Sequence, residues 1–288
     1  MGRSMDGQVA LVTGATNGIG RVTAREFARM GARTLIVARD PVRGEAVARE
    51  LREATGGTVE PLVADLSSQA QVRGLAASVR ERTGRLDLLV NNAGAIFASR
   101  ELSADGVEMT FALNHLAYFL LTLELLPLME GLPDARIVNV ASVAHEHAAI
   151  DFDDLQGARR YGMWKAYGQS KLANVLFTRE LARRIAGTGV STGALHPGAV
   201  ASGFGRNHPG FFGRLVALGA PFLSSPERGA RTTLHVATAP ALRGVSGRYF
   251  SSCREKTPSL AARNDDTARR LWQISEAMTQ PTKRLDPT

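Results

Sequence analysis

A regular alternation of short apolar runs and longer segments of helical spacing most constrains how this chain folds. Most of the apolar runs are rich in β-branched residues or leucine and end at Gly, Asn, Asp or Ser, as buried strands do. They cover residues 9–13, 34–39, 59–65, 86–91, 136–141, 192–196 and 248–250. The alternation predicts an α/β fold: a doubly wound parallel sheet of about seven strands with helices on both faces, in a single domain over residues 1–288.

The segments between the apolar runs carry helix start and stop signals. Asp40 before Pro41, and Ser225 before Pro226, each place a capping side chain ahead of a proline at the first helical position. Helices are expected over residues 18–30, 41–54, 67–81, 104–129, 166–185 and 226–238. In such sheets ligands bind beyond the carboxyl ends of the strands, at the switch point, so the functional residues are expected there.

The charge balance is basic, with a formal net charge of +8. Four of the 35 basic residues are lysines and the rest are arginines, scattered in runs no longer than two. This scatter favours a solvated basic surface over a nucleic-acid partner, although a positive potential could also attract an anionic cofactor or substrate. We therefore expect no nucleic-acid binding.

The cysteine count and the hydropathy bear on location. Cys253 is the only cysteine, so no intrachain disulfide can form and a reducing compartment is allowed. The most apolar stretch, 116–129, is too short to span a bilayer and contains Glu124 and Pro127. With no secretory segment near Met1, the sequence predicts a cytoplasmic protein without a membrane anchor.

A glycine-rich turn follows the first apolar run directly. It reads Thr13-Gly14-Ala15-Thr16-Asn17-Gly18-Ile19-Gly20 and opens the first predicted helix. Glycines let the backbone fold tightly and approach a pyrophosphate at the positive end of the helix. An ordinary tight turn is the alternative, but the position between strand and helix favours dinucleotide binding.

With Thr13 ahead of it, the G-x-x-x-G-x-G spacing resembles the short-chain dehydrogenase/reductase family, whose members have the Rossmann fold. The other motifs follow in the family's order over about residues 7–252: Asp65-Leu66, Asn91-Asn92-Ala93-Gly94, Asn114, Ser142, Tyr167-x-x-x-Lys171 and Pro197-Gly198. The resemblance implies cofactor contacts at Gly14, Thr16, Asn17, Gly18, Ile19, Gly20, Arg39, Asp65, Leu66, Asn92, Ala93, Gly94, Tyr167, Lys171, Pro197, Gly198 and Val200.

The end of the second strand decides which nicotinamide cofactor is expected. An NAD site usually carries an acidic residue there, whereas this chain has Ala38 followed by Arg39. The planar guanidinium of an arginine suits a ribose 2′-phosphate. We predict NADP(H) over NAD(H), although Asn17 stands where many NADP-dependent relatives have a second basic residue. The neighbouring Asp40 could bind a ribose hydroxyl, but it fits a helix N-cap better.

The resemblance also implies the catalytic residues. Tyr167 would be the general acid/base, Lys171 would bind the nicotinamide ribose and lower the pKa of Tyr167, and Ser142 would orient the carbonyl. Asn114 would support a water-linked proton relay to Lys171. Tyrosine and lysine four positions apart lie on one face of a helix.

A second Y-x-x-x-K pattern, Tyr161 to Lys165, competes with the first. We choose Tyr167 and Lys171, because Ser170 precedes this lysine and 172–174 (Leu-Ala-Asn) follow it, as in the family. The first copy follows Gly157 and two arginines and is expected to be a loop or an irregular helix start.

The branch of the family is indicated by the long spacing of 25 residues between Ser142 and Tyr167. Together with Asn114-His115-Leu116, 195–198 (Leu-His-Pro-Gly) and 268–272 in the tail, it resembles the retinol dehydrogenase-like branch and its soluble bacterial relatives. That branch usually acts on lipophilic aldehydes, ketones and alcohols. Several eukaryotic members have an N-terminal membrane anchor, which we do not expect here.

The segment 199–225 is expected to be a substrate loop, and 253–288 a helical tail. The apolar residues of the segment 199–225 fit either a lid over a bulky apolar substrate or a helix packed on the core. No metal site is expected, because His145, His147 and His208 lack carboxylate or cysteine partners at ligand spacing.

Three functions remain open at this point. The first is NADP(H)-dependent interconversion of a lipophilic aldehyde or ketone and its alcohol. The second is an alcohol dehydrogenase that works oxidatively with NAD, and the third is a non-catalytic NADP-binding scaffold.

Relatives often pair through the helices expected at 104–129 and 166–185, which allows a homodimer, but the long segment after Ser142 could obstruct that face.

Overall fold

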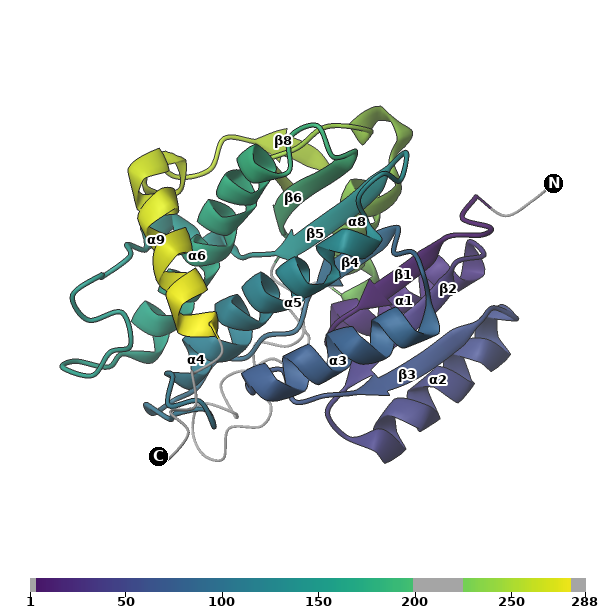
Figure 1. The fold of residues 1–288 in the computed structure, drawn as a ribbon, viewed down its shortest axis with the longest axis horizontal. Coiled ribbons are helices and arrows are strands. Elements are labelled where there is room, and N and C mark those ends of the chain that lie inside the picture. The colour runs from purple at the N-terminus through teal and green to yellow at the C-terminus, as the bar shows by residue number, and fades with distance from the viewer. Residues whose placement is uncertain (1–3, 199–224, 281–288) are drawn as a thin grey trace, which may run out of the picture.

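The computed structural model describes residues 4–198 and 225–280, which form a single three-layered α/β domain (Figure 1). Within these residues one sheet of eight strands has the order β3-β2-β1-β4-β5-β6-β7-β8. The strands are β1 (Val9–Val12), β2 (Arg33–Ala38), β3 (Val59–Val63), β4 (Leu88–Asn91), β5 (Ala135–Val140), β6 (Val190–His196), β7 (Arg248–Ser251) and β8 (Arg254–Lys256). Neighbouring strands are parallel except for β7 and β8. The predicted doubly wound parallel sheet is confirmed, with one strand more than expected.

Helices cover both faces of the sheet, as Figure 1 shows. One face carries α1 (Gly18–Arg29), α2 (Pro41–Thr55) and α8 (Pro226–Thr238); the other carries α3 (Gln69–Arg82), α5 (Ala117–Leu125) and α6 (Met163–Arg184). Alternate strand residues supply the two cores: Leu11 packs toward α3, α5 and α6, whereas Val12 packs toward α1, α2 and α8. This period of two is what buries a parallel sheet on both faces.

The predicted helix starts at Asp40 and Ser225 are confirmed. The Asp40 carboxylate accepts a hydrogen bond from the Arg43 backbone N–H (2.8 Å), and α2 ends at Gly56 with φ of +63°. Ser225 caps α8 in the same way. The third helix begins slightly later than expected, because Ser68 is its capping residue. Side chains with a local acceptor thus fix where these helices begin.

The helix expected over 104–129 is shorter and irregular. Its first turn, α4 (Met109–Phe111), begins where the Glu108 carboxylate accepts from the backbone N–H groups of Thr110 and Phe111. A π-helical turn, η1 (Ala112–Leu116), follows, in which Ala117 N donates to Ala112 O, and then α5 and a short 3-10 turn, η2 (Leu126–Leu128). The stretch Met109–Leu128 is long and apolar enough to span a membrane, but 67% of its most apolar window is buried inside the protein. It belongs to the core.

The C-terminal part of the described chain is not purely helical. Before α9 (Asp265–Thr279) it forms β8, which pairs antiparallel with β7 across a two-residue turn at Ser252 and Cys253, and a 3-10 turn, η6 (Ala261–Arg263). Both turn residues have positive φ, 52° and 58°, the conformation of a tight hairpin that matches the strand twist.

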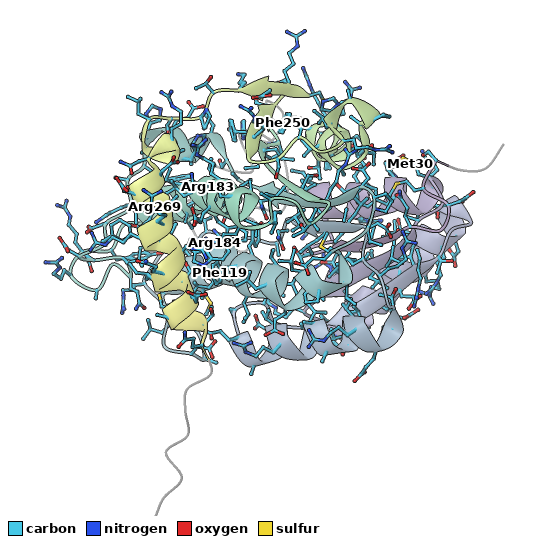
Figure 2. All side chains as sticks on the ribbon, turned by 45° about the horizontal axis from the view of Figure 1, so that its top comes forward. Met30, Phe119, Arg183, Arg184, Phe250 and Arg269 are labelled. Atoms are coloured by element: carbon cyan, nitrogen blue, oxygen red, sulfur yellow. The ribbon has the colours of Figure 1, made fainter. Side chains whose placement is uncertain are left out.

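Helix α9 lies across the outside of α6 and reaches the end of α5 (Figure 1). Trp272 of α9 packs against Phe119 (ring centres 4.8 Å apart) and stacks on Phe177 (5.9 Å). Figure 2 shows Arg184 and Phe119 beside this helix, and the Arg184 guanidinium lies 4.2 Å above the Trp272 ring. The tail is therefore part of the folded core.

Candidate active site

The glycine turn lies at the switch point of the sheet, where the chain order reverses between β1 and β4. Thr13 joins the two strand ends: its hydroxyl accepts from the backbone N–H groups of Asn92 (2.8 Å) and Ala93 (3.0 Å). The Asn92 side chain returns a hydrogen bond to Thr13 O (2.8 Å). These bonds hold the predicted glycine turn and the 91–94 turn side by side at the carboxyl edge.

Two of the glycines allow backbone approaches that no side chain would permit. A Cβ on Gly14, which has φ of +63°, would lie 2.8 Å from Ala93 Cα, and one on Gly20 would lie 2.5 Å from Gly14 O. Asn17 is exposed at the start of α1 without a side-chain capping bond, and the first turn of α1 contains no acidic residue. The helix N-terminus therefore keeps donor N–H groups and a positive end for a pyrophosphate, which fits a dinucleotide.

Two arginines stand beyond the carboxyl end of β2. Arg39 follows β2, Arg43 lies in the first turn of α2, and both are exposed. Neither guanidinium has an ion pair or hydrogen bond within residues 4–198 and 225–280. After β3, the Asp65 carboxylate accepts from Ser67 N (2.9 Å) and Ser67 Oγ (2.7 Å), and the Leu66 side chain is buried.

The predicted catalytic side chains converge at the ends of β5 and α6. Tyr167 and Lys171 lie on the buried face of α6, and Ser142 lies two residues after the end of β5. The side chain of Ser142 lies near enough to the phenol of Tyr167 to act on its pKa. The Lys171 ammonium donates to Val140 O (3.0 Å) and lies 5.7 Å from the centre of the Tyr167 ring. Three groups from two adjoining elements thus share one small volume.

Burial controls the protonation of this cluster. Only 8% of Tyr167 and 3% of Lys171 is exposed. Loss of hydration raises the pKa of Tyr167 to about 12, a rise that the hydrogen bond with Ser142 opposes, and lowers the pKa of Lys171 to about 7. The expectation that the Lys171 ammonium lowers the pKa of the phenol stays a prediction, and the burial of Tyr167 acts against it.

Asn114 lies in the π-helical turn and faces the same edge. Its amide pairs with Ala95 in both directions, accepting from Ala95 N (2.8 Å) and donating to Ala95 O (2.9 Å). It also donates to Ser170 Oγ on α6 (3.1 Å). A Cβ on Gly94 would lie 3.1 Å from Asn114 Oδ1 and 3.4 Å from Lys171 Nζ, so this turn closely adjoins both side chains.

The competing Tyr161 and Lys165 pair lies elsewhere. Tyr161 precedes α6, and its hydroxyl donates to Phe97 O (2.8 Å). Lys165 is exposed and forms an ion pair with Asp151 (2.8 Å). The expectation of a loop or an irregular helix start is confirmed, because Tyr161 precedes α6 and Lys165 lies in its first turn, and the two residues do not join Ser142.

Some predicted site residues are described only in part. Pro197 and Gly198 follow β6 at the same edge, and Gly198 has φ of +91°. Val200, His208 and nearly all of the expected substrate loop lie outside the described residues.

Sequence reasoning missed two contributors to this edge. Thr13 was treated only as part of the glycine motif, and its role in joining the ends of β1 and β4 was missed. The available signal was its position between the first strand and the first glycine. Arg43 was overlooked because it stands inside a helix pattern, and only the capping bond at Asp40 places it one turn from Arg39.

Comparison with known proteins agrees with this geometry. A family model described as short chain dehydrogenase matches residues 8–209. The chain is 46% identical over 271 residues to retinol dehydrogenase 12 of Mus musculus, which covers 93% of this chain and 85% of that protein. A crystal structure of a protein from Mycobacterium paratuberculosis has a TM-score of 0.78 at 35% identity, covering 96% of this chain and 94% of that one.

A second structure, the NADP active-site complex of Pseudomonas aeruginosa RhlG, has a TM-score of 0.69 at 31% identity and covers 86% of this chain and 96% of that one. The chain therefore belongs to the short-chain dehydrogenase/reductase family, in its retinol dehydrogenase-like branch, and is an oxidoreductase that acts on CH–OH and C=O groups.

Proposed function

We propose that this chain is an NADP(H)-dependent oxidoreductase that interconverts a lipophilic aldehyde or ketone and its alcohol, with Tyr167 as the general acid/base. The observation that carries the proposal is the convergence of Tyr167, Lys171 and Ser142 at the carboxyl edge of the sheet, beside the glycine turn. A non-catalytic scaffold would not require these three groups together. The cytoplasmic location remains a prediction.

Each catalytic residue has a role that follows from its surroundings. Bound NADPH supplies the hydride. Ser142 Oγ already accepts from Ala144 N (3.2 Å), so its hydroxyl proton can be directed at the carbonyl oxygen. Tyr167 gives its proton to that oxygen as negative charge develops there. Lys171 binds the ribose, and Asn114 holds the Ala95 turn against α6.

The protonation state of Tyr167 suits proton donation to the carbonyl. A phenol whose pKa is about 12 is protonated throughout the physiological range, which is the form that reduction needs. Oxidation needs the tyrosinate, which burial disfavours. The protein therefore holds the proton that reduction consumes, and the ratio of the two cofactor forms sets the direction of net turnover.

The preference for NADP(H) rests on the two exposed arginines. Arg39 and Arg43 offer planar donors at the strand end where NAD sites usually have an acidic residue. The similar RhlG structure is a complex with NADP. An arginine pair binds a phosphate more strongly than a hydroxyl, because its hydrogen bonds to the phosphate also join groups of opposite charge.

The apolar nature of the substrate rests on two exposed side chains that flank the catalytic groups. Val143, next to Ser142, is 45% exposed, and Trp164, one turn before Tyr167, is 60% exposed. The Trp164 and Tyr167 rings lie 6.3 Å apart, edge to face. Apolar surface left at the mouth of a site gains free energy when an apolar substrate covers it. The similar mammalian proteins are named as retinol dehydrogenases.

The test is a homologous series of straight-chain aldehydes with NADPH, measured as kcat/KM for the purified protein. We expect turnover whose kcat/KM rises with chain length, by up to about fourfold per methylene buried. Trp164→Ala should flatten this rise for long aldehydes and leave short ones unchanged. An absence of turnover across the series, and across branched and aromatic ketones, would contradict the proposal.

A further inference from the structure

The peptide unit that joins Ser142 to Val143 is held at both ends by histidine rings. His145 Nδ1 bonds to Ser142 O (2.7 Å), and the Val143 N–H donates to His196 Nδ1 (3.2 Å). The carbonyl and the N–H belong to one planar group. The two rings therefore fix the orientation of the peptide plane next to the Ser142 side chain.

Each ring accepts a hydrogen bond from a backbone N–H, which requires a neutral ring with a defined tautomer. A carbonyl oxygen only accepts, so His145 Nδ1 carries a proton; its Nε2 accepts from Ser259 N (3.5 Å) and carries none. A backbone N–H only donates, so His196 Nδ1 carries no proton and the ring proton is on Nε2. Protonation of His196 would set an N–H against the Val143 N–H and break this bond.

The surroundings of the two rings come from four elements. His145 lies in a 3-10 turn, η3 (Val143–His147), is fully buried, and meets the Tyr249 ring of β7 edge to face at 4.9 Å. His196 ends β6; Glu146 of η3 favours its charged form, whereas His145 and Lys256 of β8 disfavour it. Burial lowers the pKa of both histidines below the usual 6.5.

We propose that His145 and His196 are positioning residues for Ser142, and that protonation of His196 releases the Ser142–Val143 peptide unit and lowers kcat. The proposal rests on the proposed function, because Ser142 must bind the substrate oxygen for its orientation to matter. Ser142 also caps η3 through Ala144 N, so a rotation of this peptide plane would move the hydroxyl away from Tyr167.

The pH dependence follows from the neutral form. As the pH falls through the pKa of His196, below 6.5, the acceptor is lost and kcat should decrease. Tyr167, with a pKa of about 12, stays protonated over this range, so the acid limb cannot come from the proton donor.

Two substitutions at position 196 separate the hydrogen bond from the charge. His196→Asn keeps an acceptor near the place of Nδ1 and does not titrate; we expect near wild-type kcat at neutral pH and no acid limb. His196→Phe keeps the ring and removes the acceptor; kcat should fall by about tenfold to hundredfold, with KM for NADPH unchanged. His147→Asn, at an exposed position two residues beyond His145, is the matched control. It should change neither kcat at neutral pH nor the acid limb of the pH profile.

The tautomers provide a readout that does not depend on turnover. Isotope-labelled histidine in the full chain should show by NMR a proton on Nδ1 of His145 and on Nε2 of His196 at neutral pH. An acid limb that persists in His196→Asn, a His196→Phe enzyme with full kcat, or the opposite tautomers would overturn the proposal. Tyr167-dependent turnover would leave the proposed function standing in each of these cases.

Discussion

At the residue scale, Arg39 is the side chain whose charge should decide the cofactor. Arg39→Ala removes donors to a 2′-phosphate but none that a ribose hydroxyl requires. We expect KM for NADPH to rise by about tenfold or more, because a charged hydrogen bond is lost, and KM for NADH to change little. Steady-state kinetics with both cofactors measures this.

Arg49→Ala provides the control for that substitution, since Arg49 is an exposed arginine about two turns beyond the first residue of α2. It should leave both KM values unchanged. A wild-type enzyme that prefers NADH tenfold, or an Arg39→Ala variant with unchanged KM for NADPH, would contradict the assignment of NADP(H).

Residue types in sequence order were sufficient to predict which side chains meet at the candidate site, but not the environment of those side chains. Tyr167, Lys171, Ser142 and Asn114 were predicted by number, and the structure brings them together. The rise of the Tyr167 pKa was not predicted, because it depends on burial, which a motif does not reveal. His145 was taken as a loop histidine for the same reason, although it is fully buried.

At the scale of elements, a buried histidine joins α9 to the catalytic side of the molecule. His115, in the π-helical turn next to Asn114, bonds through Nε2 to Ser275 Oγ of α9 (2.8 Å) and through Nδ1 to Asn174 Oδ1 of α6 (3.3 Å). Asn174 in turn donates to Asn114 O (2.9 Å). The C-terminal helix is thus linked to the turn that carries Asn114 by a continuous hydrogen-bond chain.

This link should make the free energy of unfolding depend on pH. Burial lowers the pKa of His115 from 6.5 to about 4 in the folded state, so the unfolded chain binds its proton first as the pH falls. The stability contributed by neutral His115 is fully present above pH 6.5 and is lost between that value and about pH 4, amounting to about 3 kcal/mol.

Urea unfolding of the wild type and of His115→Gln at several pH values measures this contribution. The stability difference between the two proteins should be largest at neutral pH and shrink as the pH approaches 4. A difference that stays constant over this range would show that His115 does not titrate in this way.

Element boundaries show where pattern reasoning fails. The π-helical turn at Ala112–Leu116 was not predicted, because an unbroken apolar segment hides one extra residue in a helical turn. β8 was not predicted either: Arg254, Glu255 and Lys256 are charged and exposed, without alternation, and they form a strand because the turn at Ser252 and Cys253 returns the backbone to β7. Pairing at a sheet edge needs no apolar side chains.

At the scale of the whole molecule, the C-terminal segment closes two surfaces. α9 covers the outer side of α6 and packs Trp272 against Phe119 of α5 (Figure 2). These two helices, α5 and α6, are the ones through which a homodimer was expected. The charged strand β8 occupies one end of the sheet. A dimer that pairs through α5 and α6 would have to accommodate α9, and the homodimer stays a prediction.

The account of the whole molecule depends on which of two tyrosines gives the proton, and steady-state turnover of an aldehyde with NADPH by Tyr167→Phe and Tyr161→Phe tests it most directly. Tyr167→Phe should lower kcat by about a hundredfold to ten-thousandfold while NADPH binding persists, since only the proton donor is removed. Tyr161→Phe, which loses a hydrogen bond to Phe97 O, should retain turnover. Turnover by Tyr167→Phe at the wild-type rate, or its loss in Tyr161→Phe alone, would contradict the account.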